Sequence, residues 1–353
     1  MAIDGKMFVV LLFVLFLIEQ AKISYCYDCN GLVLNGPEAD GAYISGGCGQ
    51  PVVDWRLGKD SIENLQQILR KGNVHVRLRG QGTLALPEKC LGPLGPNVTM
   101  DGTKGRIRIT GPKFVHLGPK SRNILITGLC FSFNENAIDM TDGGEKVWVT
   151  RNTFYNTSFG SPTAFRGYDK GRTRGTREIH LSRNWYGPSR FGPGFFGGID
   201  HASVYLNYMV DIGTRTPSVN TGRFHVCNNV IEGWDLGFQS HCYAHNLIEK
   251  NLMIVKEGWK SRPIFAGPLR GGDDTCGDDY ERSTICWKDN KIVGNKSEIA
   301  LLSGANKHMV KFDCDWELPF EPLPCKKIPQ DTDKFRDLVR KMAGVPNHWC
   351  DFE

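Results

Sequence analysis

One spacing of apolar residues recurs along the middle of the chain. Between residues 120 and 292, an apolar residue, any residue, a second apolar residue and two further residues are very often followed by Asn. The pattern occurs at Ile124–Leu129, Val147–Asn152, Ile179–Asn184, Val204–Met209, Phe224–Asn229, Leu247–Asn251 and Ile285–Asn290. Its second apolar residue returns mostly at intervals in the low twenties, with longer intervals after Asn152 and Asn251. A repeat of this length with occasional insertions is typical of a solenoid.

Each unit of the repeat predicts one short β-strand. Alternation in Val147-x-Val149 places two apolar side chains on the same face of a strand, and such a strand must stack on its neighbours to be stable. Asn suits the following position because it tolerates a left-handed backbone and forms local hydrogen bonds. We expect these Asn side chains to stack from coil to coil and to satisfy one another's amides. The sequence therefore predicts an all-β fold, a single-stranded parallel β-helix, whose loops would bind a long, extended ligand.

Two short amphipathic helices are predicted near the ends of this solenoid. The first follows Ser61, ends at Gly72 and has the apolar residues Ile62, Leu65, Ile68 and Leu69. We expect it to cover the open apolar end of the first coil. The second follows Thr332, and its apolar residues are Phe335, Leu338, Val339 and Met342. We expect this helix to pack back against the rod.

The composition divides the chain into four segments. Residues 1–24 contain Lys6 and the apolar run Met7–Ile18, which is short for a bilayer span, so they predict a signal peptide, with a signal anchor as the alternative. Cleavage after Ser24 leaves all twelve cysteines. The remaining segments are a Cys- and Gly-rich stretch at 25–59, the β-helix at 60–300 and a tail with one helix at 301–353. We expect a secreted protein, extracellular or in a cell wall, that does not contact a membrane after cleavage.

Cysteines and glycosylation sequons agree with this compartment. Twelve cysteines in a secreted chain predict disulfides rather than thiols. Cys276 with Cys286 and Cys314 with Cys325 are plausible pairs, although the connectivity cannot be deduced from the sequence. Sequons that predict a glycoprotein begin at Asn97, Asn156 and Asn295.

Positive charge gathers in one stretch of the chain. The formal net charge is +5, and the basic residues between positions 166 and 190 are Arg166, Lys170, Arg172, Arg174, Arg177, Arg183 and Arg190. Such a stretch would attract a polyanion, and a solvated basic loop is the alternative interpretation. Nucleic acid is not expected as the partner, because the chain has a predicted signal peptide and no nucleic-acid-binding motif.

Several short motifs, taken together, resemble the pectate lyase and pectin lyase family. They occur in the family's order, and the similarity extends over residues 60 to 300. The motifs are Asn97–Gly102, Asn123–Leu129, Ala137–Met140 with Val147–Val149, and Arg215–Pro217 with Phe224–Asn229. The resemblance implies a right-handed parallel β-helix that cleaves homogalacturonan by β-elimination. It also implies an acidic polysaccharide as the partner, and we expect a monomer.

The resemblance assigns roles to four arginines. Arg215, ahead of Pro217, matches the family's Arg-x-Pro motif, whose arginine is thought to remove the proton from C5 of a uronate. Arginine is normally protonated, so a role as base requires a strongly lowered pKa. Arg151 and Arg166 are the expected electrostatic partners of Arg215. The family's lysine that usually binds a substrate carboxylate falls near Pro193 in this chain, and Arg190 is the cation nearest to that position.

The chain departs from the family at the calcium site. The positions of the acidic ligands are Asn134, Asn136, Ser161 and Phe165, and calcium prefers several charged or carbonyl oxygens. The second arginine of the catalytic motif is Asn220. Three interpretations remain open: a lyase in which fixed cations replace calcium and no cofactor is needed, a calcium-dependent pectate lyase with altered ligands, and a catalytically inactive protein that binds acidic polysaccharide.

Overall fold

The structure is a computed structural model that describes most of the solenoid and parts of both ends. The described residues are 25–26, 34–35, 38–39, 42–86, 90–132, 135–140, 143–157, 160–167, 177–266, 283–294, 302–303, 307–312, 314, 325, 327–345 and 349–350. The predicted signal peptide, the sequon at Asn295 and Cys276 lie outside these residues. None of the helices in the described part has the length and apolar character that crossing a membrane requires.

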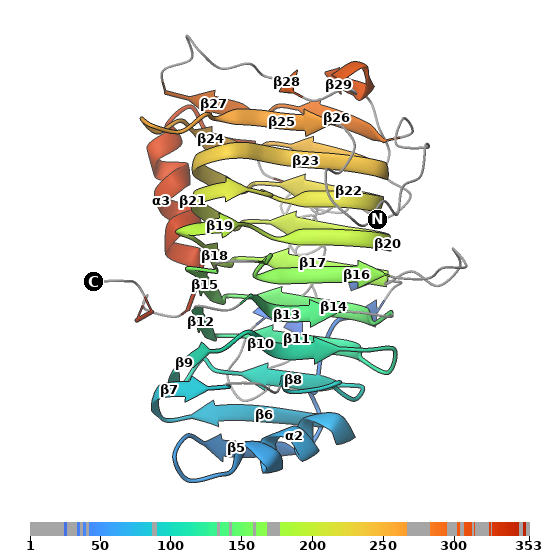
Figure 1. Cartoon of the computed structure of the whole chain (residues 1–353), viewed down its shortest axis with the longest axis vertical. Helices are drawn as coiled ribbons and strands as arrows, with labels where there is room; N and C mark the ends of the chain where they lie inside the picture. The colour runs from blue at the N-terminus through green and yellow to red at the C-terminus, as the bar shows by residue number, and fades with distance from the viewer. Residues whose placement is uncertain are drawn as a thin grey trace, which may run out of the picture.

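The chain forms a right-handed parallel β-helix of about nine turns, as predicted. Figure 1 shows its coils stacked along the long axis of the molecule. In-register parallel strands form three faces, and the first face consists of β6 (Val74–Arg79), β8 (Val98–Asp101), β11 (Arg122–Thr127), β14 (Glu145–Thr150), β17 (Arg177–Ser182), the ends of β20 (Gly194–Tyr205), β22 (Ser218–Cys227) and β23 (Val230–Glu249), then β26 (Thr284–Lys288) and β29 (Val310–Phe312).

Two further faces complete each coil. The second face contains β7 (Gln81–Ala85), β9 (Arg106–Thr110), β12 (Cys130–Ser132), β15 (Thr153–Tyr155), β18 (Trp185–Tyr186), β21 (Tyr208–Thr214), the start of β23, β24 (Leu252–Ile254) and β27 (Lys291–Val293). The third face contains β10 (Lys113–Leu117), β13 (Asn136–Met140), β16 (Thr163–Gly167), the starts of β20 and β22, the middle of β23, β25 (Arg262–Ala266) and β28 (Leu302–Ser303). β5 (Val52–Arg56) pairs with β6 and begins the first face, and β19 (Ser189–Phe191) pairs with the second half of β21. Outside the three faces lie the helical turn η2 (Lys307–Met309) and the short antiparallel strands β1 (Tyr25–Cys26), β2 (Leu34–Asn35), β3 (Glu38–Ala39) and β4 (Ala42–Tyr43).

The parallel register stacks like side chains inside the rod. Ile126, Val149 and Leu181 follow one another in one inward column of the first face. On the second face the rings of Phe131 and Phe154 stack with centroids 4.9 Å apart. Burying these columns removes apolar surface from water along the whole rod, which is the main stabilising contribution of the fold.

The register corrects one unit of the sequence repeat. Val204 pairs with Leu181, so the unit in this coil is Ala202-x-Val204-x-x-Asn207, and the predicted unit Val204–Met209 was wrong by two residues. Leu206 looked like an apolar anchor because its neighbours are also apolar, but it lies at the corner with φ 56°. After this correction, Asn184 is 23 residues from Asn207, and Asn207 is 22 residues from Asn229.

The predicted Asn ladder is confirmed at the corner between the first and second faces, which we call the ladder corner. Each side-chain amide nitrogen donates to the side-chain oxygen of the next Asn at 2.8–3.2 Å, through Asn152, Asn184, Asn207, Asn229, Asn251 and Asn290. The local hydrogen bonds expected of Asn are present, since its amide donates to the carbonyl two residues earlier, but the expected left-handed backbone at Asn was wrong, because the left-handed residue precedes each Asn. Arg151, with φ 55°, is one example. A second, shorter ladder joins Asn73, Asn97 and Asn123, and these three Asn residues are themselves left-handed.

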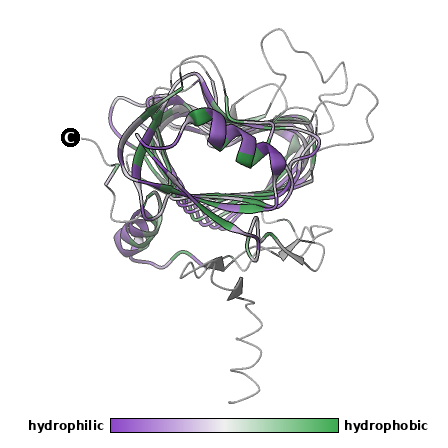
Figure 2. Ribbon diagram, turned by 90° about the horizontal axis from the view of Figure 1, so that it is seen from below, coloured by the Kyte–Doolittle hydropathy of each residue, from purple (hydrophilic) through white to green (hydrophobic). Residues whose placement is uncertain are grey.

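A helix covers the first coil, as predicted. Helix α2 (Ile62–Lys71) begins where the Ser61 side chain accepts a hydrogen bond from the backbone of Asn64, and it ends at Gly72. Leu65 and Leu69 are buried, so the helix closes the apolar end of the rod. In the view along the rod, the coils superimpose on one closed outline, and α3 lies outside it (Figure 2).

Helix α3 (Thr332–Met342) packs against the second face. Its N-cap is Asp331, which accepts from the backbone of Lys334. Phe335 and Val339 pack in a cluster with Tyr208, Val230 and Leu252 of the rod. Leu338, predicted to belong to this packed face, is 52% exposed, because the helix presents a narrower apolar stripe to the rod than its sequence contains.

Three disulfides fasten the tail to coils at different heights. They join Cys286 with Cys314, Cys227 with Cys325, and Cys130 with Cys350. The suggested pairs Cys276–Cys286 and Cys314–Cys325 are therefore wrong. Closeness in sequence was a poor guide because the tail runs back along the stacked coils, so partners far apart in sequence meet.

Candidate functional site

The candidate site lies at the corner between the second and third faces, which we call the Arg215 corner. Arg215 connects β21 to β22, Phe191 ends β19 one coil below, and Ser161 precedes β16 in the coil beneath that. Phe196 projects from β20 on the adjoining third face. Parallel stacking therefore brings together side chains that are up to 54 residues apart in sequence.

The Arg215 guanidinium is held on three sides. Its Nη1 donates a hydrogen bond of 2.9 Å to Oγ of Ser161, which is buried. Its central carbon lies 4.3 Å from the ring centroid of Phe191 and 5.0 Å from that of Phe196. The faces of both rings attract a cation, so the arrangement fixes a positive charge at a partly exposed position.

Backbone geometry at this corner depends on close contact between coils. Arg215 has φ 70°, in the left-handed region that arginine rarely adopts. Its carbonyl oxygen faces Gly192 of the coil below, where the Cβ of any other residue would overlap that oxygen. Gly192 therefore lets the two coils approach and sets the height of Arg215 above Phe191.

The structure gives the other three predicted arginines different positions. Arg190 lies beside Arg215, with its guanidinium carbon 5.1 Å from the Phe191 centroid. Arg166 pairs with Phe196 in register, and its side chain lies outside what the structure describes. Arg151 directly follows β14 at the ladder corner, away from Arg215. Only Arg190 and Arg215 are seen to share an aromatic neighbour.

The positions of the family's calcium ligands do not fit a calcium ion. Phe165 lies in the core with its ring centroid 5.4 Å from that of Phe195, and Ser161 already accepts a hydrogen bond from a cation. Asn136 is buried at the start of β13, and Asn134 lies outside the described residues. The nearby carboxylate of Asp139 lies 3.6 Å from the ammonium group of Lys113. These groups offer too few free, charged oxygens for calcium.

The sequence analysis missed both aromatic partners of Arg215. Phe191 and Phe196 lie in the stretch Arg190–Phe196, which reads Arg-Phe-Gly-Pro-Gly-Phe-Phe. Aromatic residues among glycines and a proline, directly after a basic residue, were the available signal. Their meaning depends on Arg215, which comes from a different coil.

Two histidines on the outer side of the first face are buried. His180 and His225 point away from the core, as the alternation of their strands requires, but they are 3% and 0% exposed. Other segments cover this face: Ile44 packs on Leu125 and Trp148, and Trp148 pairs in register with His180. Cys325 of the tail lies 3.5 Å from Nε2 of His225. His225 Nε2 lies 3.0 Å from a carboxylate oxygen of Glu249, and this contact lowers the pKa of Glu249 to about 2.

Burial of His180 predicts a loss of stability in acid. Desolvation, together with the charge of His201, lowers the pKa of His180 from 6.5 to about 3. The unfolded chain therefore takes up a proton below pH 6.5 that the folded chain does not. The free energy of unfolding should fall by up to about 1.4 kcal/mol per pH unit on acidification towards pH 3. Urea unfolding of the wild type and of a His180→Leu variant across this pH range measures the effect. If the free energy of unfolding depended equally on pH in both proteins, His180 would not be the group responsible.

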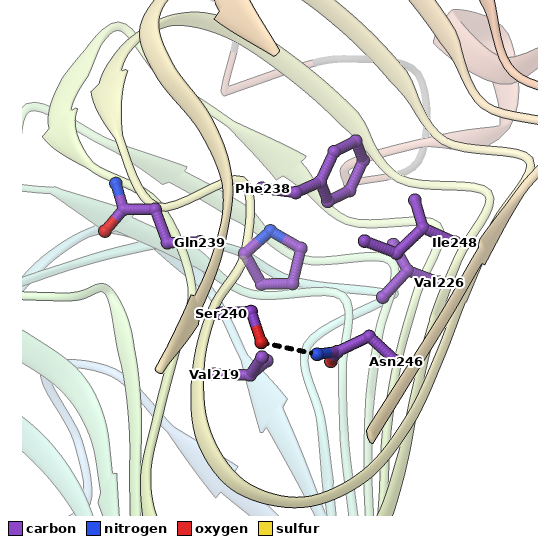
Figure 3. Close-up of a pocket in the computed structure, with 8 residues that line it drawn as sticks. Val219, Val226, Phe238, Gln239, Ser240, Asn246 and Ile248 are labelled. Carbon is purple, nitrogen blue, oxygen red and sulfur yellow. Dashed lines mark hydrogen bonds between the residues drawn. The ribbon is translucent and has the colours of Figure 1, made fainter. Parts of the chain in front are cut away.

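A small cavity lies inside the coil near the candidate site (Figure 3). It is lined by Pro217, Val219, Val226, Phe238, Gln239, Ser240, Asn246 and Ile248. A water-sized sphere has about 10 Å³ of free volume there, which is about what one water molecule needs. Asn246 donates to Ser240, while its Oδ1 is buried without a partner among the described residues. The cavity suits a water molecule and is too small for a sugar.

Comparison with known proteins identifies the fold. No protein-family model and no curated protein sequence matches the chain. Solved structures do match. A pectate lyase from a Bacillus species in complex with trigalacturonate is 15% identical, with 85% of this chain and 95% of that chain covered and a TM-score of 0.56.

Two further pectate lyases give the same result. One from Xanthomonas campestris is 14% identical, with 88% of this chain and 98% of that chain covered and a TM-score of 0.55. One from a Paenibacillus species is 12% identical, with 84% and 91% covered and a TM-score of 0.54. The resemblance expected from the motifs is therefore confirmed at the level of the fold.

Proposed function

We propose that this chain binds galacturonan at the Arg215 corner and cleaves it by β-elimination without calcium. The observation that carries the proposal is the Arg215 guanidinium, which is bonded to Ser161 and stacked between Phe191 and Phe196. Ser161 stands where the resemblance places a calcium ligand. A fixed cation thus lies beside the position that calcium-dependent relatives would give to the metal. The trigalacturonate bound by the Bacillus pectate lyase supports the choice of substrate.

The chemistry requires positive charge near a uronate carboxylate. In β-elimination a base takes the proton from C5, the electron pair of the C5–H bond forms the C4–C5 double bond, and the C4–O4 bond breaks as O4 leaves with its electrons and takes a proton from water. Negative charge develops on the carboxylate beside C5, so a preorganised cation there lowers the barrier. Arg215 supplies that charge, and Arg190, which also lies near the Phe191 ring, adds a second positive charge.

Binding without cleavage is the second candidate, and one feature of the site favours it. The two ring faces and the Ser161 oxygen all stabilise the charged form of the Arg215 guanidinium. Arginine must instead lose its own proton before it can take the proton from C5. The same contacts that suit Arg215 for holding a carboxylate therefore oppose its acting as a base.

Product formation should not depend on calcium. We expect unsaturated oligogalacturonides from polygalacturonate and from methylated pectin at the same rate with calcium and with a chelator, because the ligand positions cannot hold the metal. The ultraviolet absorbance of the conjugated product measures the rate. Product that forms only with calcium would contradict the proposal. Trigalacturonate binding by calorimetry without any product would support the second candidate, and the absence of both would exclude the two together.

A further inference from the structure

Two arginines meet at the ladder corner, away from the Arg215 corner. Arg151 directly follows β14 and Arg183 directly follows β17, and both are left-handed residues that directly precede a ladder Asn. Thr150 and Ser182 pair in register, and the backbone nitrogen of Arg151 donates to the carbonyl oxygen of Ser182. Arg151 and Arg183 therefore occupy equivalent positions in successive coils. Parallel strands are spaced about 4.8 Å apart, which places two like charges side by side.

No acidic residue in the described part of the chain is paired with either arginine. Among the same residues, Nε of Arg183 is buried without a hydrogen-bond partner. At the other end of the same strands the charges are paired, as Lys146 is with Glu178. Burial and the charge of Arg183 together lower the pKa of Arg151.

Hydroxyl groups lie next to the pair on the outside of the first face. Ser182 donates to Thr150 at 3.0 Å and accepts from the Trp148 indole at 2.9 Å. Tyr205 follows Ser182 in register and hydrogen-bonds to it. Ser182 and Thr150 are buried, so their hydroxyls serve internal hydrogen bonds, and the two partly exposed guanidinium groups are what the corner offers to a carboxylate.

We propose that Arg151 and Arg183 form a second binding site for the carboxylates of an acidic polysaccharide, independent of the Arg215 corner. The polysaccharide class rests on the function proposed above, whereas the anion-binding pair rests on the geometry of the ladder corner alone. A polymer held there would keep the protein attached to its substrate while the Arg215 corner is empty. This gain by multivalency needs no contact between the two sites.

The test uses the Arg215→Ala variant of the full chain, in which the first site is disabled. We expect it to bind long polygalacturonate still, and we expect added Arg151→Gln and Arg183→Gln substitutions to weaken this residual binding at least about tenfold. Arg122→Gln added instead is the matched control, because Arg122 is an exposed arginine of the neighbouring strand β11. Calorimetry gives the affinities, and circular dichroism checks the fold of each variant.

A direct observation on the wild-type chain complements the variants. The guanidinium resonances of Arg151 and Arg183 should shift on titration with galacturonate in a nuclear magnetic resonance spectrum, because a bound carboxylate would contact these partly exposed groups. The inference is overturned if Arg215→Ala binds no polymer, if the double substitution and the control weaken binding equally, or if the substitutions lower stability without changing affinity. Failure of the proposed function is separate, since the wild type would then form no product and Arg215→Ala would bind trigalacturonate as tightly as the wild type does.

Discussion

An Arg215→Ala variant will keep the fold and lose the activity of the Arg215 corner. We expect product formation from polygalacturonate to fall about 100- to 1,000-fold, the usual cost of removing one preorganised group that stabilises developing charge. Trigalacturonate binding should weaken with it. The fold should persist because the substituted side chain is partly exposed, and alanine meets the same backbone restriction at φ 70° as arginine does.

Two companion variants separate charge from geometry at this position. Arg215→Lys keeps the positive charge but loses the planar group that stacks on Phe191 and Phe196, so we expect intermediate activity. Arg122→Ala removes an exposed arginine far from the corner and should leave the rate unchanged. If Arg215→Ala formed product at the wild-type rate, Arg215 would have no part in the reaction.

An Asn229→Leu substitution should destabilise the rod more than any surface change. The side-chain oxygen of Asn229 accepts from the backbone and the amide of Asn207, and its amide donates to Val204, Cys227 and Asn251. Leucine would leave several buried donors and acceptors without partners. We expect the free energy of unfolding to fall by about 3–5 kcal/mol, because each orphaned group costs about 1–3 kcal/mol.

Urea unfolding with intact disulfides measures this loss. Asn64→Ala is the matched control, since Asn64 is an exposed residue of α2, and its removal should change stability by no more than about 0.5 kcal/mol. A loss for Asn229→Leu no greater than that for the control would mean that the ladder contributes little to stability. The ladder would then serve to fix the register of neighbouring coils and would add little to the free energy of unfolding.

The fold was predictable because its information is local. Alternation of apolar residues predicts each strand, and Asn predicts the corner that follows it. The regular recurrence of both predicts that the coils stack. The register error at Val204 shows the limit of this reasoning. Apolar residues near this corner allow two positions of the repeat unit along the sequence, and only the pairing of Val204 with Leu181 decides between them.

The candidate site was predictable only in part, because its members come from different coils. Arg215 was recognised from a motif, but its contacts with Phe191 and Ser161 depend on how neighbouring coils align. The burial of His180 was missed for a related reason. Alternation states which way a side chain points from its own coil, and it says nothing of the segment around Ile44 that covers this face.

The returning tail changes how the rod should come apart. In a solenoid each coil contacts only its neighbours, so an unprotected end can peel away one turn at a time. Here α3 spans the second face, and Cys350 is tied to Cys130, a residue 220 positions earlier in an early coil. The last coils cannot peel away while this brace holds, so the tail should make the whole upper rod resist fraying and proteases as a single body.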